Sequence, residues 1–251
     1  MDASTIAAQL RQKIIEGEYP HGSKLPTVRD LAAEHGVSQQ TASAVYTALG
    51  ALGLVRTDAR SGTRVAASKQ SDAHLGTFTP PDLSVAEAWK PTAAQGTATE
   101  ETTLVRQLDA PAQMTAWGIT EGTTVVERTR IRSVDGVPVQ HKMTVMPYEI
   151  AAKMPDGYEG TPPMLTPAGE TSPKAPAGVR VADWLGWDTA RTESVITAEP
   201  MDGTVCTALG IPAGAPGFRI VGVTRSSQGG TVFVTITSAQ LHHRVTLDII
   251  G

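Results

Sequence analysis

Apolar residues recur every three or four positions along the first fifty residues, and glycines interrupt the pattern. This spacing predicts three helices, the first ending at Gly17, the second over residues 27–35 and the third over about 39–52. The apolar positions that define them are Ile6, Leu10, Ile14 and Ile15 in the first helix, Leu31 and Ala32 in the second, and Ala42, Val45, Leu49 and Leu52 in the third.

Cap residues support the second and third helices. Thr27 and Ser38 can each cap a helix that starts after them, and Gly36 suits the left-handed residue that closes the second helix. The two helices then meet across a turn of about three residues. Residues 54–57 and 63–66 read as short strands around a turn. Three helices followed by such a hairpin predict a winged helix-turn-helix over residues 1–67, mainly α with a small β wing.

The next segment has a different composition. Residues 68–98 are polar and rich in Pro, Gly and Thr, with little periodicity. This composition predicts a linker with one short helix near residues 85–89.

The remaining residues, 99–251, alternate strand-like and helical segments, which predicts an α+β domain with an antiparallel sheet. Helices are expected around Ala151 and before Ile211, with a proline-rich excursion between the hairpins, and its course over residues 155–178 stays open. The predicted strands are Thr124–Arg132 and Val137–Val145, joined at Asp135-Gly136; Phe218–Arg225 and Thr231–Ser238, around Gly229-Gly230; and Arg244–Ile250.

Length and composition exclude several classes of protein. A chain of 251 residues favours two domains, and its formal charge of −4 argues against coating nucleic acid by charge alone. No apolar run approaches the roughly 20 residues that span a bilayer, and the start lacks the order of a signal peptide, so we expect a cytoplasmic protein without a membrane segment. The single cysteine, Cys206, excludes a multi-cysteine zinc site and is expected to be buried. We expect no metal and no cofactor.

The first domain fixes several motif spacings at once. Leu25-Pro26-Thr27-Val28-Arg29-Asp30-Leu31-Ala32, Gly36-Val37-Ser38, Gly53-Leu54-Val55 and Gly62-Thr63-Arg64-Val65 follow in this order. The signature spans about a quarter of the chain and resembles the GntR family of bacterial regulators. The resemblance implies a sequence-specific DNA-binding transcription factor, most often a repressor. A winged helix that packs only against protein is the alternative.

Motifs of the second domain carry a weaker but extended resemblance. They are Ala110-Pro111-Ala112, Gly118-Ile119, Gly122-Thr123, the run Val126–Arg132, Asp135-Gly136-Val137-Pro138, Pro147, Leu209–Gly214 and the closing hairpin. Together they are similar to the UTRA effector-binding domain of the HutC subfamily, which resembles the chorismate lyase fold.

The resemblance implies that the start of the third helix enters the major groove. Glutamine can pair bidentately with adenine, and Arg29 matches an arginine that contacts DNA in the family, unless it forms an ion pair with Asp30 or Glu34. Members usually carry arginine at Gln39, often another at Ser43, and glycine at Arg60, so the operator sequence stays open. The candidate DNA-binding residues are Thr27, Arg29, Ser38, Gln39, Gln40, Thr41, Ser43, Arg60, Thr63 and Arg64.

The same resemblance implies a small effector held against the sheet. Arg130 and Arg132 alternate onto one face of a strand and match arginines that grip an anionic group, although cross-strand ion pairs are the alternative. Lys142 and Phe233 stand where relatives tend to place glutamate, which disfavours a sugar held through its hydroxyls. The candidate effector-binding residues are Arg130, Arg132, Lys142, Thr144, Phe233 and Thr235.

Two copies on a palindromic operator are expected, because one winged helix offers a small interface and bacterial oligomers are most often twofold. A regulator without a ligand, whose second domain only dimerises, is the first alternative. A chorismate-lyase-like enzyme is a remote one, since His141, His242 and His243 come without a nucleophile, paired carboxylates or metal spacing, and adjacent histidines of a strand point to opposite faces. We therefore expect no catalytic residues.

Overall fold

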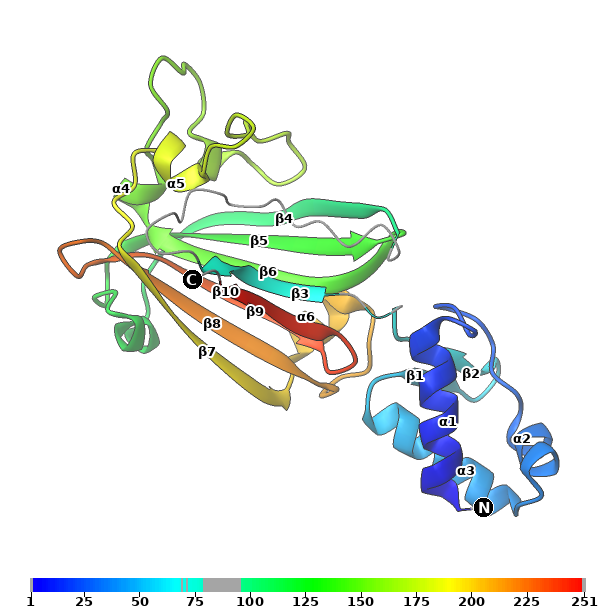
Figure 1. Cartoon of the computed structure of the whole chain (residues 1–251). Helices are drawn as coiled ribbons and strands as arrows, with labels where there is room; N and C mark the ends of the chain where they lie inside the picture. The colour runs from blue at the N-terminus through cyan, green and yellow to red at the C-terminus, as the bar shows by residue number, and fades with distance from the viewer. Residues whose placement is uncertain (1, 69, 71, 79–95, 250–251) are drawn as a thin grey trace.

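The structure, a computed structural model, describes the chain except residues 1, 69, 71, 79–95 and 250–251. The short helix expected near residues 85–89 lies outside the described residues. Figure 1 shows two bodies, a helical one at the N-terminus and a larger one built on a sheet. Residues 2–68 are called the head below, and residues 96–249 the sheet domain.

The head contains three helices and a hairpin. Helix α3 (Gln39–Ala51) packs against both α1 (Ala3–Glu16) and α2 (Val28–His35), and strand β1 (Val55–Asp58) pairs antiparallel with β2 (Gly62–Val65). These elements confirm the predicted order of three helices and a wing.

Local chemistry sets the helix boundaries of the head. The Thr27 hydroxyl accepts a hydrogen bond from the backbone N–H of Asp30, and Ser38 accepts one from Thr41. Gly17 and Gly36 close α1 and α2 with φ values of 86° and 62°, in the left-handed region that favours glycine.

The core of the head lies between the three helices and the hairpin. It contains fifteen buried side chains, and its most enclosed members are Ile6, Ala42, Val45 and Leu49, each 0% exposed. Leu52, predicted on the apolar side of the third helix, is instead 40% exposed. The reason is that α3 ends at Ala51, so Leu52 leaves the helical path at the cap.

The sheet domain is built on six antiparallel strands in the order β4-β5-β6-β9-β8-β7. The paired strands β5 and β6 are joined by Asp135 (φ 51°) and Gly136 (φ 77°), the doubly left-handed turn predicted for this hairpin. Strands are β4 (Ala98–Asp109), β5 (Thr124–Val134), β6 (Val137–Pro147), β7 (Arg191–Pro200), β8 (Pro216–Arg225) and β9 (Thr231–Gln240).

Three strands were not predicted by the alternation of apolar residues. Both edge strands of the sheet, β4 and β7, are rich in polar residues and mostly exposed, so they lack a clear apolar period. Strand β3 (Asp72–Phe78) lies within the predicted linker and pairs in parallel with β10 (Arg244–Ile249). The predicted last strand therefore lies outside the six-stranded antiparallel sheet.

Short helices cover the sheet. One face packs on η2 (Ala112–Trp117), and the other packs under an excursion that contains α4 (Tyr148–Ala151), η3 (Pro163–Leu165) and α5 (Val181–Trp184). Helix α6 (Gly203–Leu209) precedes β8 and buries Cys206, as predicted for this residue. Figure 1 shows α4 and α5 above the β4 and β5 side of the sheet.

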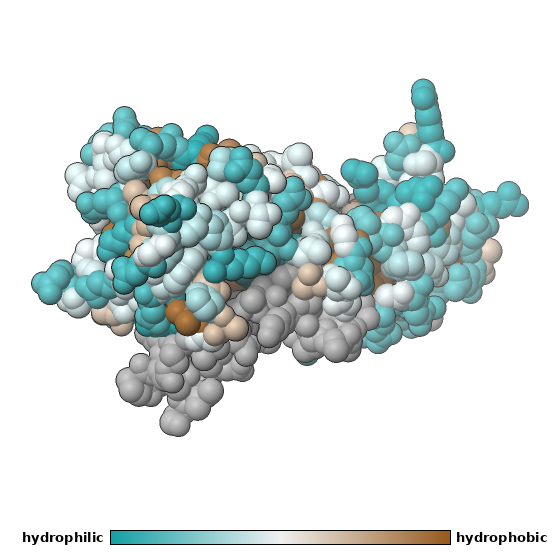
Figure 2. Space-filling view, turned by 90° about the horizontal axis from the view of Figure 1, so that it is seen from above, coloured by the Kyte–Doolittle hydropathy of each residue, from teal (hydrophilic) through white to brown (hydrophobic). Residues whose placement is uncertain are grey.

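Seen from above, the molecule is largely hydrophilic, and hydrophobic residues reach this face only in small separate patches (Figure 2). Among the helices of the described residues, none combines the length and apolar character that a membrane crossing requires.

Candidate nucleic-acid interface and anion site

The start of α3 presents unpaired polar side chains. Within the described part of the chain, the side chains of Gln39, Gln40 and Ser43 are exposed and bind no other residue. Ser38 and Thr41 differ, because their hydroxyls lie 2.9 Å apart and serve the helix cap. Two glutamines and one serine are therefore the groups at this helix end that remain available to an external partner.

Arg29 lies exposed in the first turn of α2. Asp30 and Glu34, the two acids that the sequence offered as ion-pair partners of Arg29, have other contacts. Asp30 accepts a hydrogen bond from the Thr27 hydroxyl at 2.7 Å, and Glu34 lies 3.9 Å from His35. The guanidinium of Arg29 makes no ion pair with the described residues. Thr27, also a predicted DNA contact, uses its hydroxyl to cap α2.

The wing holds two further arginines. Asp58 accepts hydrogen bonds from the backbone N–H groups of Ser61 and Arg60, both at 2.9 Å, which shape the turn and lower the pKa of the Asp58 carboxyl. The Arg60 side chain is left exposed at the tip. Arg64 is also exposed and donates to the carbonyl of Gly22 at 2.9 Å.

Thr63 does not reach the surface expected for it. It is 7% exposed, and its hydroxyl lies 3.0 Å from that of Thr57 inside the hairpin. Lys24, in contrast, was not among the predicted contacts, yet it is exposed and forms a β-bridge with Arg64 beside the wing. No local sequence signal marks Lys24, because its neighbours come from a strand forty residues away.

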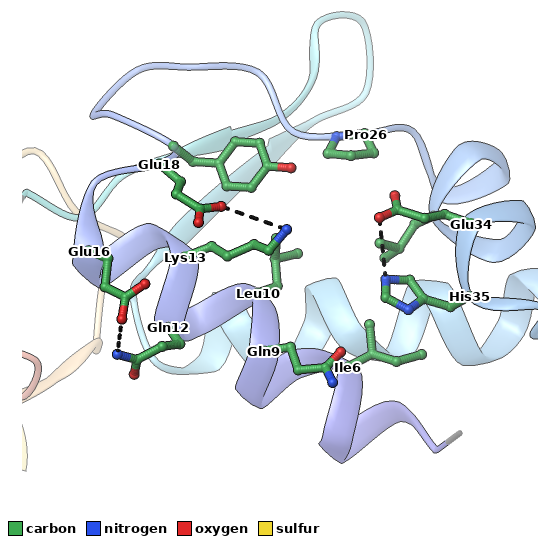
Figure 3. A pocket seen from close by; sticks show the side chains of 12 residues that line it. Ile6, Gln9, Leu10, Gln12, Lys13, Glu16, Glu18, Pro26, Glu34 and His35 are labelled. Carbon is green, nitrogen blue, oxygen red and sulfur yellow. Dashed lines mark hydrogen bonds and ion pairs between the residues drawn. The ribbon is translucent and has the colours of Figure 1, made fainter.

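A cavity of about 340 Å³ opens on the head between α1 and α2 (Figure 3). Its polar rim is paired internally, with Lys13 3.7 Å from Glu18 and Gln12 donating to Glu16 at 2.7 Å. It lies away from the sheet face on which the effector residues were predicted, and nothing about its chemistry points to a ligand.

The predicted effector residues share one face of the sheet. The antiparallel register places Arg130 opposite Lys142, Arg132 opposite Gln140, and Thr144 opposite Thr235. Residues opposite each other in a ladder project to the same face, and Phe233 follows the same alternation. Phe233 packs 5.6 Å from the ring of Trp187, under the excursion that covers this face.

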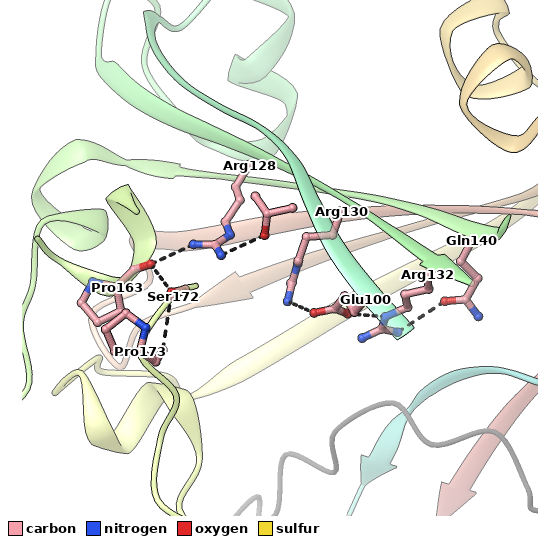
Figure 4. A network of polar contacts seen from close by, with 9 residues as sticks. Glu100, Arg128, Arg130, Arg132, Gln140, Pro163, Ser172 and Pro173 are labelled. Atoms are coloured by element: carbon pink, nitrogen blue, oxygen red, sulfur yellow. Dashed lines mark hydrogen bonds and ion pairs between the residues drawn. The ribbon is translucent and has the colours of Figure 1, made fainter. Parts of the chain in front are cut away.

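The carboxylate of Glu100 binds both predicted arginines, Arg130 and Arg132 (Figure 4). Glu100 of β4 accepts a hydrogen bond from Arg130 Nη1 at 2.8 Å and another from Arg132 Nε at 2.6 Å. Both guanidinium groups hold the pKa of Glu100 down at about 2, against the effect of its burial. The alternative of cross-strand ion pairs is therefore realised in this structure, and the sequence pattern missed Glu100 because β4 was not predicted.

Neighbouring cations extend this cluster along the face. Arg128 donates to the Pro163 carbonyl at 2.8 Å and to the Thr102 hydroxyl at 3.0 Å. Burial, with Arg132 and Arg130 nearby, lowers the pKa of Lys142 to about 7. Two buried polar atoms of the face, Arg130 Nε and Thr144 Oγ1, have no hydrogen-bond partner. Buried polar atoms of this kind usually have a partner, so they are candidates for a ligand contact.

Buried polar contacts join the head to the sheet domain. Gln240 Nε2 donates to the carbonyl of Gly53 at 3.0 Å, and His242 Nε2 lies 3.0 Å from the carbonyl of Ser68. His243 Nε2 lies 3.3 Å from the Ser68 hydroxyl. These contacts, together with the packing of Gly53 on Ala215, are called the joint below.

The histidines of the joint differ from their prediction. His242 and His243 lie in the turn between β9 and β10, each 3% exposed, with ring centroids 4.0 Å apart. They do not point to opposite faces of a strand, because the strand ends at Gln240. His141 is on β6 and is also buried.

Both the head and the sheet domain are similar to parts of known proteins. The family model described as bacterial regulatory proteins, gntR family, matches residues 2–65, and the UTRA domain model matches residues 94–164. The HTH-type transcriptional regulator Rv1152 of Mycobacterium tuberculosis is 36% identical over 84 residues, covering 32% of this chain and 69% of that protein. The uncharacterized HTH-type transcriptional regulator YjiR of Escherichia coli K12 is 44% identical over 64 residues, which are 26% of this chain and only 14% of that protein.

A solved structure shows the same fold over the whole chain. PhnF from Mycobacterium smegmatis aligns with a TM-score of 0.50 and 19% identity, covering 98% of each chain. The winged head, the antiparallel sheet domain and these matches define a DNA-binding transcriptional regulator with a UTRA domain. The chain belongs to the GntR family.

Proposed function

We propose that this chain is a sequence-specific repressor of the HutC type that reads DNA with the start of α3. The observation that carries the proposal is the set of exposed, unengaged side chains of Gln39, Gln40 and Arg29 beside a basic wing. A glutamine amide offers the donor and acceptor that adenine presents in the major groove, and an arginine suits a phosphate. Selection of bound duplexes from a random library, followed by footprinting, tests it, and failure to enrich any sequence would contradict it.

The proposal separates backbone contacts from base contacts. Arg29→Ala is expected to weaken binding to all duplexes about equally and to reduce the salt slope of the affinity by about 1, because one phosphate contact is lost. Gln40→Ala is expected to cost about 1–3 kcal/mol on the selected site and much less on other sequences, because it removes base readout. Fluorescence anisotropy at several salt concentrations measures both effects.

A matched control uses another exposed glutamine of the head. Gln9→Ala removes the same chemical group from α1, outside the predicted DNA-contacting residues, and should leave both the affinity and the specificity unchanged. If Gln40→Ala behaves like Gln9→Ala while Arg29→Ala relaxes specificity, the assignment of the two roles is wrong.

We also propose that two copies act together on a palindromic operator, with half-sites about 34 Å apart. Strand β7 supports this arrangement. It is the outer strand of the sheet, most of its residues are exposed, and Val195 and Ile196 keep 62% and 47% of their surfaces in contact with solvent. Exposed edges of this kind are templates for pairing with another chain.

Charge favours antiparallel pairing of β7 with its copy. A twofold axis at Val195 would place Arg191 opposite the partner subunit's Glu199, a register that joins opposite charges over the full length of β7. Within one chain, Arg191 lies 2.9 Å from Glu193 and Glu199 lies 3.5 Å from Arg219, so the new pair would share these exposed groups. Arg191→Glu or Glu199→Arg alone should therefore shift the chain towards monomer, and the double variant should restore the dimer. Sedimentation velocity measures this, and a dimer that ignores both single variants would place the interface elsewhere.

The domain division proposed here is residues 1–67 for DNA binding, 68–98 for the connection, with β3 inside it, and 99–251 for effector binding and dimerisation. We place the protein in the cytoplasm and assign it no enzymatic activity. In the proposed mechanism a small anionic effector binds the cationic sheet face and shifts the heads to a spacing that no longer fits the operator. A coupling of about 1–3 kcal/mol is enough for such a response.

One observation favours a second candidate, a regulator whose sheet domain takes no ligand. Arg130 and Arg132 already bind Glu100, so a carboxylate of the chain itself balances part of the positive charge of this face without an effector. Thermal-shift screening of anionic metabolites with the full chain distinguishes the two candidates. A stabilising anion that also releases DNA supports the effector, and a complete absence of both responses supports the second candidate.

A further inference from the structure

Glu100 is placed where an anionic ligand would bind. It projects from the edge strand β4, directly opposite Arg132 in the ladder and diagonal to Arg130. Its carboxylate makes one charge-assisted hydrogen bond to each guanidinium, the contacts that a ligand carboxylate or phosphate would make. Its side chain is still 32% exposed, so solvent and small solutes reach it.

The charges of the face are unequal. Arg128, Arg130, Arg132 and Lys142 lie along two adjacent strands, while Glu100 supplies one negative charge among them. One carboxylate does not neutralise the three arginines of this row. Burial first, and then the nearby Arg132 and Arg130, lower the pKa of Lys142 to about 7, so Lys142 adds most of its positive charge below that pH. Arg130 Nε and Thr144 Oγ1 also stay without a hydrogen-bond partner while Glu100 is bound.

We propose that Glu100 is an internal anion that holds the effector site in its unliganded state and is displaced by the anionic group of the effector. The inference rests on the proposed function, in which this face binds an effector. A ligand with one carboxylate would only exchange like for like and leave Glu100 without a partner. An anion with two charges adds attraction to the whole row, so the internal carboxylate selects for doubly charged ligands.

The position of Glu100 connects occupancy of the site to the chain leading to the head. Glu100 is the third residue of β4, which is an edge strand and has a register shift between Thr102 and Leu104. Edge strands hold fewer partners than central ones, so loss of the Glu100 contacts weakens the start of β4 selectively. In the sequence, β4 follows the connection to the head, so displacement of Glu100 acts at the start of the strand that comes directly after this connection.

The test is binding of inorganic phosphate to the full chain at pH 7.5, measured by calorimetry, with acetate as the singly charged probe. Glu100→Gln removes the internal charge but keeps an amide of the same shape, and it is expected to raise phosphate affinity by at least about tenfold. Glu101→Gln is the matched control, because Glu101 is the next residue of the same strand, is exposed, and lies opposite Ile131 on the other face.

A second readout follows displacement in the unaltered protein. Hydrogen exchange at residues 98–102 should rise when phosphate binds the wild type, and it should already be high in Glu100→Gln without phosphate. A purely structural Glu100 would give faster exchange in the variant with no gain in phosphate affinity. This readout keeps the test decisive if Glu100→Gln is too unstable for calorimetry.

Each outcome decides between ideas. Equal phosphate affinity of the wild type and Glu100→Gln overturns the internal-anion proposal but leaves the effector site intact. Absence of phosphate binding to both proteins, or a phosphate affinity that Arg130→Ala leaves unchanged, overturns the anionic effector site and the inference with it. Acetate binding as tightly as phosphate overturns the selection for doubly charged ligands, and an increase in affinity with Glu101→Gln equal to that with Glu100→Gln assigns the effect to net charge.

Discussion

Gly53→Ala is expected to destabilise the protein by about 1–3 kcal/mol more than Gly36→Ala. Both glycines have left-handed backbones, with φ values of 71° and 62°. The left-handed conformation therefore costs alanine a similar free energy, about 1–2 kcal/mol, at each position. A Cβ at Gly36 meets nothing within 4 Å, whereas one at Gly53 lies 2.7 Å from Ala215 Cβ and 3.2 Å from Gln240 Nε2. The joint must open to accept it, and the Gln240 hydrogen bond to Gly53 is weakened.

The additional loss of stability in Gly53→Ala should come from weaker contacts between the head and the sheet domain. Denaturant unfolding gives the difference in stability, and ¹⁵N relaxation shows whether the head tumbles independently in Gly53→Ala. Gly36→Ala should leave the head docked, because Gly36 closes α2 inside the head alone. Equal losses of stability, with identical tumbling in both variants, would mean that the joint does not hold the two parts together.

Acidification is expected to destabilise the joint through His242. Burial lowers the pKa of His242 from 6.5 to about 4, and the repulsion from Arg11 of α1 acts in the same direction while the Ser68 carbonyl opposes it. Its Nε2 faces the Ser68 carbonyl. A second proton would bind Nδ1, which is buried and has no acceptor beside it for the new N–H group. The ring of His243 also lies 4.0 Å away and would repel the charge if it were protonated too.

The sign follows from the direction of the shift. Because the pKa is lower in the folded state, the unfolded chain binds more protons between pH 6.5 and pH 4. The stability present at neutral pH is therefore lost as the pH falls through this window, by about 3 kcal/mol in total for a shift of this size. Thermal unfolding between pH 7.5 and pH 4 measures the loss.

His242→Gln isolates this residue from other titrating groups. The glutamine amide can donate to the Ser68 carbonyl but does not titrate, so the variant should show a flatter pH profile than the wild type. The pKa of His141 is also lowered, mainly by burial, but His141 is present in both proteins and cancels in the comparison. Parallel profiles for the two proteins would show that His242 does not cause the acid sensitivity.

The head could be predicted from the sequence almost element by element. Its helices carry apolar residues at helical spacing, and their ends are set by groups one to three residues away, such as Ser38 and Gly36. Such signals are local and survive without knowledge of the fold. Gln39, Gln40 and Arg29 were identified through the resemblance to the GntR family, which rests on these same local motifs.

The cationic face was predicted only in part. Alternation along the strand predicted that Arg130 and Arg132 share one face, and the resemblance to the UTRA domain added Lys142 and Thr144 as candidates. The register of the structure places Arg130 opposite Lys142. Glu100, the partner of the two arginines, lies thirty residues earlier on an edge strand without an apolar period, so no local pattern connected it to the arginines. Its presence changes the site from a free pair of guanidinium groups to an occupied one.

By itself, the sequence determined the winged head, the central hairpins of the sheet domain and the residue types at the start of α3, because each depends on neighbours within a few positions. Only the tertiary structure decided that Thr63 is buried, that Glu100 binds the arginines, and that Gln240 and His242 reach the head. Those outcomes depend on long-range strand pairing and on burial, in which a polar group takes whichever partner the fold brings within hydrogen-bond distance.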